Sequence, residues 1–239
     1  MKKIIILVLL IILGIFIYLK IQVMGNPNSS FNQTTRFTFG KYPFMRTLLG
    51  LHKAGDARGE YLRNQGDVLI EWFKPESEDV DISVLDKLAA EVKKYTGRQA
   101  NVVYGGPVDD TTLSLSNLNA FGYKARVQKT SGSTVLSVFF TSDYSPRPDG
   151  EFSTTYLDSG LVIPLSANRR AAMDSGMPLD SYLSLGLLRE FGRQIGLEPN
   201  NGDDCILNNS IEIYNAIELT DFCELEQNQI SQFKQQFSN

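Results

Sequence analysis

The segment that most constrains this chain is the predicted helix Leu179–Ile195, together with the glycine that follows it. Arg189 and Arg193 are four residues apart, so on an α-helix their side chains lie one above the other on the same face. Glu190 directly follows the first arginine, and Gly196 permits a sharp backbone turn after the helix. Taken alone, this pattern is common on amphipathic helices and is typical of a solvated face with an Arg193–Glu190 pair; the residues that follow it decide whether it marks a functional site.

Strands and helices alternate along the rest of the chain. The order strand, helix, strand between Asp67 and Tyr104 predicts a parallel pair joined by a crossover helix. The strands are expected at Asp67–Phe73, Gln99–Tyr104, Thr134–Thr141, Phe152–Tyr156 and Leu161–Leu165, with the third of them central. The other helices are expected from Asp81 or Ser83 to Gly97, at Thr111–Phe121, and from Thr220 or Asp221 to Phe237. This order predicts an α+β fold, α/β-like, with a mixed twisted sheet and about three main helices.

The composition is that of a globular domain with one sizeable core. The chain has 239 residues, of which 42% are hydrophobic and 21% are charged. Its formal net charge is −4 and its sequence pI is near 5.1, and no stretch concentrates lysine and arginine. Since neutralising phosphates requires clustered basic residues, we expect no nucleic-acid partner.

The N-terminus predicts one transmembrane helix. An uncharged apolar run from Ile4 to Leu19 is followed by Lys20 and a further apolar stretch to Met24. Because Lys20 can extend its ammonium group to the interface, residues 4–24 match a bilayer core of about 30 Å. No small-x-small cleavage site follows, which favours a signal anchor in residues 1–24 over a cleaved signal peptide and a secreted protein.

The charges at the N-terminus predict the orientation of this anchor. Lys2 and Lys3 favour a cytoplasmic short end, with the rest of the chain on the extracytoplasmic side of the cell membrane. Residues 25–64 are then a tether and an irregular lead-in, and residues 65–239 are the domain.

Around the predicted helix the sequence resembles a zinc-peptidase motif. With histidines in place of Arg189, Arg193 and Pro199, the segment would be H-E-x-x-H-x-x-G-x-x-H, the metzincin signature. Residues 200–208 are similar to the metzincin segment that runs to the Met-turn, with Leu207 where the methionine stands. Residues from about 65 to 239 therefore resemble a metzincin-type zinc peptidase, closest to archaemetzincins and small matrixin-like proteins.

The resemblance implies a zinc site whose ligands are absent here. In such peptidases the positions of Arg189, Arg193 and Pro199 bind zinc, and that of Glu190 activates water. Arginine offers only hydrogen-bond donors, and proline offers no side-chain lone pair. The sequence contains a single histidine, His52, far from this segment. We expect no metal and no cofactor, and interpret Glu190 as a vestigial general-base position.

Two hypotheses concern what the vacated positions do. In one, Glu190 pairs with Arg193, and Arg189 holds an anionic group such as a peptide carboxylate. In the other, both arginines are simply exposed to solvent in a cleft that has no activity.

Cys205 and Cys223 are predicted to form a disulfide, because thiols are oxidised outside the cytoplasm. Two buried thiols are the alternative. The resemblance bears on this choice, since archaemetzincins carry a second metal site of four cysteines. Here the corresponding positions are Asn200, Cys205 and, approximately, Cys223 with Glu226. With half of that site missing, the disulfide is favoured.

These observations predict a membrane-anchored, catalytically inactive metzincin-like ectodomain that binds a peptide or protein. The resemblance implies a cleft beside an edge strand, for which Phe152–Tyr156 and Leu161–Leu165 are the candidates. One alternative is an active peptidase using Glu190, either zinc-dependent or borrowing a metal through Glu198, Asp203 and Asp204. The other is a purely structural extracellular module.

Overall fold

The computed structural model forms two compact units, residues 1–56 and 57–239. It describes residues 11–21, 39, 42–49, 51, 56–62, 66–108, 113–114, 133–145, 152–156, 160–202, 204–208 and 220–237. His52, Asp203 and residues 1–10 and 22–24 of the predicted anchor lie outside the described residues.

The first unit contains a helix at residues 11–21 and a second helix, α3 (Pro43–Leu49). Leu49 and Leu51 are buried in a small apolar cluster, against which Phe16, Leu19 and Met45 pack. Over the described part of the chain, no helix is both long enough and apolar enough to cross a membrane.

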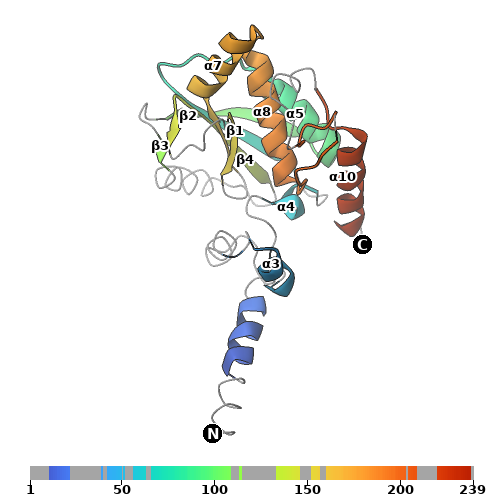
Figure 1. Ribbon diagram of the computed structural model, residues 1–239. Helices are drawn as coiled ribbons and strands as arrows, with labels where there is room; N and C mark the ends of the chain where they lie inside the picture. Colours follow the sequence, from blue (N-terminus) through green and yellow to red (C-terminus); the bar gives the residue numbers. More distant parts are fainter. Residues whose placement is uncertain are drawn as a thin grey trace. The chain divides into compact units, whose positions relative to one another are not determined.

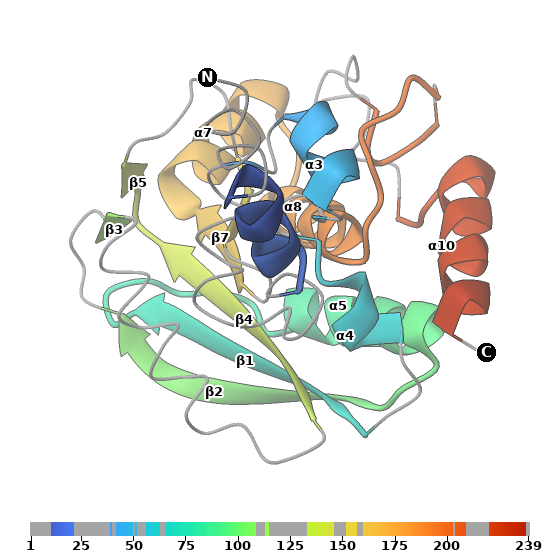
Figure 2. The ribbon, with the colours of Figure 1, turned by 90° about the horizontal axis from the view of Figure 1, so that it is seen from below.

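The second unit is built on a mixed five-stranded sheet (Figures 1 and 2). Its spatial order is β2-β1-β4-β7-β6, in which the first four strands are parallel and β6 is antiparallel to β7. The strands are β1 (Val68–Pro75), β2 (Ala100–Val108), β4 (Thr134–Thr141), β6 (Thr154–Tyr156) and β7 (Gly160–Pro164). The predicted parallel pair and the predicted central position of β4, whose residues are all buried, are both confirmed.

Helices α5 and α8 lie side by side along the sheet (Figure 1). The helices of this unit are α4 (Arg58–Leu62), α5 (Ser83–Thr96), α7 (Leu165–Ser175), α8 (Leu179–Gln194) and α10 (Glu224–Phe237). Asp81 accepts a hydrogen bond from the Ser83 amide at 2.9 Å, and Gly97 ends α5 with a φ of 75°. Both ends of α5 therefore follow the sequence prediction.

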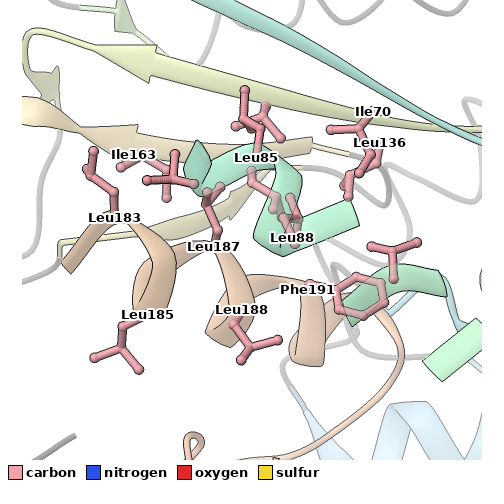
Figure 3. Packing of buried hydrophobic residues seen from close by; sticks show 14 of the residues in the cluster. Ile70, Leu85, Leu88, Leu136, Ile163, Leu183, Leu185, Leu187, Leu188 and Phe191 are labelled. Atoms are coloured by element: carbon pink, nitrogen blue, oxygen red, sulfur yellow. The ribbon is translucent and has the colours of Figure 1, made fainter. Parts of the chain in front are cut away.

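One continuous apolar core joins the two helices to the sheet. Leu183 and Leu187 of α8 point toward Ile163 of β7, whereas Leu185 and Leu188 point away from the sheet (Figure 3). Residues of both kinds are buried, so α8 is enclosed on most of its circumference. A helix buried on so many sides holds its few polar side chains in fixed positions.

The structure corrects two of the predicted elements and adds one helix. Leu161–Leu165 is not an edge strand, because β7 lies between β4 and β6 and Leu165 already begins α7. Helix α7 was not predicted. Within Thr111–Phe121, Leu113–Ser114 forms strand β3, which pairs with β5 (Tyr144–Ser145); the rest of that predicted helix lies outside the described residues.

Candidate functional site

Glu190 is completely buried, and both of its carboxylate oxygens accept hydrogen bonds. Ser153 Oγ donates to Oε1 at 2.9 Å, and Thr155 Oγ1 donates to Oε2. Arg193 Nη1 donates to Oε1 at 2.7 Å and supplies the opposite charge. The carboxylate therefore ties the edge strand β6 and the segment before it to α8.

Arg189 and Arg193 share a helix face but differ in their surroundings. The predicted ion pair between Arg193 and Glu190 is present, with the arginine side chain 31% exposed. Arg189 is half-buried, and its guanidinium carbon lies 5.9 Å from the centre of the Phe152 ring. Neither guanidinium offers a lone pair, so the pair cannot bind a divalent cation.

Gly196 makes the turn that the sequence predicted. Its φ is 92°, in the left-handed region, and the amide of Leu197 donates back to the carbonyl of Gly192 at 3.0 Å. A Cβ on Gly196 would lie 2.4 Å from Arg58 Nε, so the arginine of α4 occupies the space that a side chain would need. Pro199 follows, half-buried, at the position where the resemblance puts a third ligand.

Helix α4 packs against the end of α8. The amide of Ala57 donates to the Gln194 carbonyl at 2.7 Å, and the Tyr61 hydroxyl donates to Gln194 Oε1 at 2.6 Å. The compact unit accordingly begins at Ala57, and the segment before β1 supports the turn at Gly196.

The turn at Leu207 packs directly against α8. Leu207 is completely buried, and a Cβ added to Gly192 would lie 3.0 Å from Leu207 Cδ1. The chain returns to this position because the Asn200 amide donates to the Leu207 carbonyl at 3.0 Å. Leu207 thus lies against the candidate helix, as the Met-turn resemblance implies.

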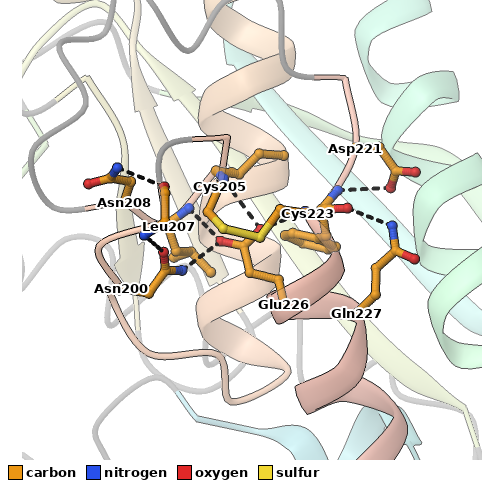
Figure 4. The surroundings of a disulfide bond; sticks show 11 residues. Asn200, Cys205, Leu207, Asn208, Asp221, Cys223, Glu226 and Gln227 are labelled. Atoms are coloured by element: carbon orange, nitrogen blue, oxygen red, sulfur yellow. Dashed lines mark hydrogen bonds between the residues drawn. A yellow bond between two sulfur atoms is a disulfide. The ribbon is translucent and has the colours of Figure 1, made fainter.

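Cys205 and Cys223 form the predicted disulfide, with 4.9 Å between their Cα atoms (Figure 4). The bridge spans 18 residues and contributes roughly 3 kcal/mol on the chain-entropy estimate.

Glu226 lies beside the disulfide, completely buried, and accepts four hydrogen bonds (Figure 4). The donors are the amides of Ile206, Leu207 and Cys223 and the side-chain nitrogen of Asn200, at 2.7–3.3 Å. In a capping box, a glutamate three residues into a helix accepts a hydrogen bond from the amide of the residue that caps it. Glu226 makes this contact with the Cys223 amide at the start of α10. One carboxylate therefore holds both the Leu207 turn and the last helix.

The same three groups, Cys205, Cys223 and Glu226, bring potential metal-ligating atoms within 4.8 Å of one another. They do not fit a metal ion, because the sulfurs are bonded to each other and the carboxylate oxygens already face four N–H donors. Glu198 and Asp204, the alternative metal ligands, are both exposed. Neither belongs to a cluster of three or more potential metal ligands among the described residues.

A second cluster joins α5 to the start of α10. Lys94 and Tyr95 both donate hydrogen bonds to Asp221. Burial disfavours the charged form of Asp221, but these hydrogen bonds outweigh it and hold the pKa of Asp221 below its usual value. Burial and the bond to Asp221 raise the pKa of Tyr95. The cluster borders a cavity of about 410 Å³ whose wall includes Leu185 and Leu188.

Solved archaemetzincin structures are similar to this fold. The archaemetzincin of Methanopyrus kandleri matches with a TM-score of 0.52 and 13% identity, over 71% of this chain and 96% of that chain. A zinc-dependent peptidase of Methanocorpusculum labreanum and the archaemetzincin of Archaeoglobus fulgidus match with TM-scores of 0.48 and 0.43. Each of these two is 13% identical, over 67% of this chain and 99% of its own. No protein-family model and no curated protein matches the sequence.

At this identity the similarity establishes the fold alone. The chain has an archaemetzincin-like α+β fold with a mixed five-stranded sheet, and the predicted fold class is confirmed to that extent.

Sequence reasoning missed the partners that complete the site. Ser153 and Thr155 are two residues apart on an extended segment, so their side chains share a face, but nothing in that pattern selects Glu190 as their acceptor. Glu226 was missed because the predicted start at Asp221 places Glu224 at the capping-box position, whereas helix α10 begins after Cys223, whose amide donates to Glu226.

Proposed function

We propose that this chain is a membrane-anchored pseudopeptidase, in which an archaemetzincin-like domain binds a peptide or protein outside the cytoplasm without cleaving it. One observation carries the proposal: Glu190, at the general-base position, is completely buried and already bonded on both oxygens.

A general base must present a free lone pair to the water that it activates. The Glu190 carboxylate is completely buried and accepts from Ser153, Thr155 and Arg193, so neither of its oxygens faces solvent from which it could take up and activate a water molecule. A zinc peptidase also needs a metal that lowers the pKa of the water, and arginine and proline at the three ligand positions do not bind one. Both halves of the hydrolytic machinery are therefore missing.

Peptide binding does not require the metal. Strand β6 is an edge of the sheet, antiparallel to β7, and lies next to α8. An extended peptide can add to such an edge through main-chain hydrogen bonds alone. The contacts of Ser153 and Thr155 with Glu190 hold this region against α8 and so keep the edge in a fixed position.

The anchor is supported by the N-terminal sequence and by the first unit. The apolar run begins after Lys2 and Lys3, and the described helix at 11–21 exposes most of its large apolar side chains. Such a surface is stable in lipid, and the two lysines favour a cytoplasmic N-terminus.

The absence of zinc binding is tested by metal analysis of the purified full chain in detergent. We expect far less than one equivalent of zinc after incubation with zinc and desalting. The triple variant Arg189→His, Arg193→His, Pro199→His is expected to bind about one equivalent, because helix α8 and the Gly196 turn supply the ligand spacing.

The matched control replaces the same three residues with alanine, which removes the same contacts without adding ligands. One equivalent of zinc on the unchanged chain would contradict the proposed inactivity. A folded histidine variant that binds no more zinc than the alanine control would contradict the assigned ligand positions.

Peptide binding at the β6 edge is tested by hydrogen exchange. Peptides selected on an array for binding to the full chain are expected to slow amide exchange at Thr154–Tyr156. The opposite edge, β2, is an internal control that should keep its exchange rates. Protection of β2 instead of β6 would disprove the edge assignment, and failure to select any peptide would disprove peptide binding.

A further inference from the structure

Helix α3 and the residues before it expose an unusual amount of apolar surface. Phe44 is 71% exposed and Tyr42 is 51% exposed, and Phe39 and Leu48 are exposed as well. Aromatic side chains carry about 150–250 Å² of surface each, so three of them and a leucine within ten residues are unfavourable in water.

Two other large side chains of α3, Met45 and Leu49, face the helix at 11–21. Met45 and Leu49 form one apolar cluster with Phe16 and Leu19. Helix α3 therefore has two apolar sides, of which one is packed against the first helix and the other is uncovered within its unit.

The packed side fixes the depth of α3 relative to the proposed anchor. Phe16 and Leu19 lie in the second half of the proposed span of residues 4–24, toward its extracytoplasmic end. Amphipathic helices settle with their apolar faces about 5–10 Å into the boundary between headgroups and acyl chains. Contact with Phe16 and Leu19 places α3 within that layer.

The exposed side chains of this segment are of the types that suit the boundary between lipid headgroups and acyl chains. Tyr42 combines an aromatic ring with a polar hydroxyl, and phenylalanine and leucine suit the adjoining acyl chains. The neighbouring helix exposes Ile15, Ile17, Tyr18 and other apolar side chains in the same unit. The lipid that covers this helix would also cover α3, since the two are in contact.

We infer that α3 is an interfacial membrane helix, which lies in the outer leaflet beside the anchor and buries Phe39, Tyr42, Phe44 and Leu48 in lipid. The inference rests on the proposed anchor.

Site-directed spin labelling of the full chain tests this arrangement. Both native cysteines are bridged, so a single introduced cysteine takes the label. Phe44→Cys reports on α3, Ile17→Cys on the anchor, and Met173→Cys, at a site 82% exposed in the second unit, serves as the aqueous control. The labelled chains are placed in vesicles of phosphatidylcholine and phosphatidylglycerol at a ratio of 3:1.

Collisions with oxygen, which concentrates in lipid, are compared with collisions with a water-soluble nickel chelate. We expect oxygen to dominate at positions 17 and 44, more strongly at 17, and nickel to dominate at 173. Leu48→Cys provides a second site on α3 and should resemble position 44.

The possible failures are distinguishable. Dominant oxygen at 17 with dominant nickel at both 44 and 48 would overturn the interfacial helix and leave the anchor intact. Dominant nickel at 17 would overturn the anchor and the interfacial helix together. Spin–spin broadening at 44, removed by dilution with unlabelled chain, would show that a second copy covers α3 instead of lipid.

Discussion

Replacing Glu226 by glutamine is expected to lower the free energy of unfolding by about 2–4 kcal/mol, because one buried and one partly buried N–H donor lose their acceptor. Each carboxylate oxygen of Glu226 accepts from two donors. The NH₂ group of glutamine is itself a donor, so it cannot accept hydrogen bonds from the two N–H groups that it would face. The change is measured by urea unfolding in detergent, followed through Trp72, the single tryptophan of the chain.

The matched control is Glu224→Gln in the first turn of the same helix, where the side chain is exposed. It removes the same charge near the helix N-terminus but no buried contact, so the change is expected to stay within about 0.5 kcal/mol. Equal unfolding midpoints for the two variants would contradict the role given to Glu226.

Replacing Arg193 by alanine is expected to destabilise the domain by about 2–3 kcal/mol, because the completely buried Glu190 loses its opposite charge. The value is at the low end for such pairs, since the Arg193 side chain is 31% exposed and water can reach its position. The effect is measured as the shift in the urea midpoint of the full chain.

Arg189→Ala is the control, one helical turn away on the same face. Its guanidinium lies 5.9 Å from the centre of the Phe152 ring, and its removal leaves Glu190 paired with Arg193, so a smaller loss than for Arg193→Ala is expected. Double replacement Glu190→Gln, Arg193→Ala should recover part of the lost stability, because a neutral group then replaces the unpaired charge. If Arg193→Ala proved no more harmful than Arg189→Ala, the ion pair would not be what holds Glu190.

Local patterns in the sequence predicted most of the elements that build the domain. The apolar spacing of α5, its glycine stop and the buried run of β4 all act within one element, so neighbouring residues suffice to reveal them. Helix α7 was missed because it begins directly after Pro164 of β7, without a loop to separate it from the strand.

The candidate site was predictable only in part. The spacing of Arg189, Glu190 and Arg193 shows which side chains share a face of α8, and it predicted the Arg193–Glu190 pair. Ser153 lies 37 residues from Glu190, and Arg58 lies 138 residues from Gly196. Contacts at such separations depend on the path of the whole chain.

The sequence by itself determined which residue types stand on the candidate face of α8 and where the backbone turns after it. One histidine cannot supply a three-histidine zinc site, and a glycine at 196 permits the left-handed turn whatever surrounds it. Only the tertiary structure decided what occupies the site instead. It joined the two cysteines and brought the hydroxyls of Ser153 and Thr155 to Glu190. It also placed the carboxylate of Glu226 under the Leu207 turn. A buried polar group must find its partners wherever the packed chain puts them, and its own sequence neighbourhood does not name them.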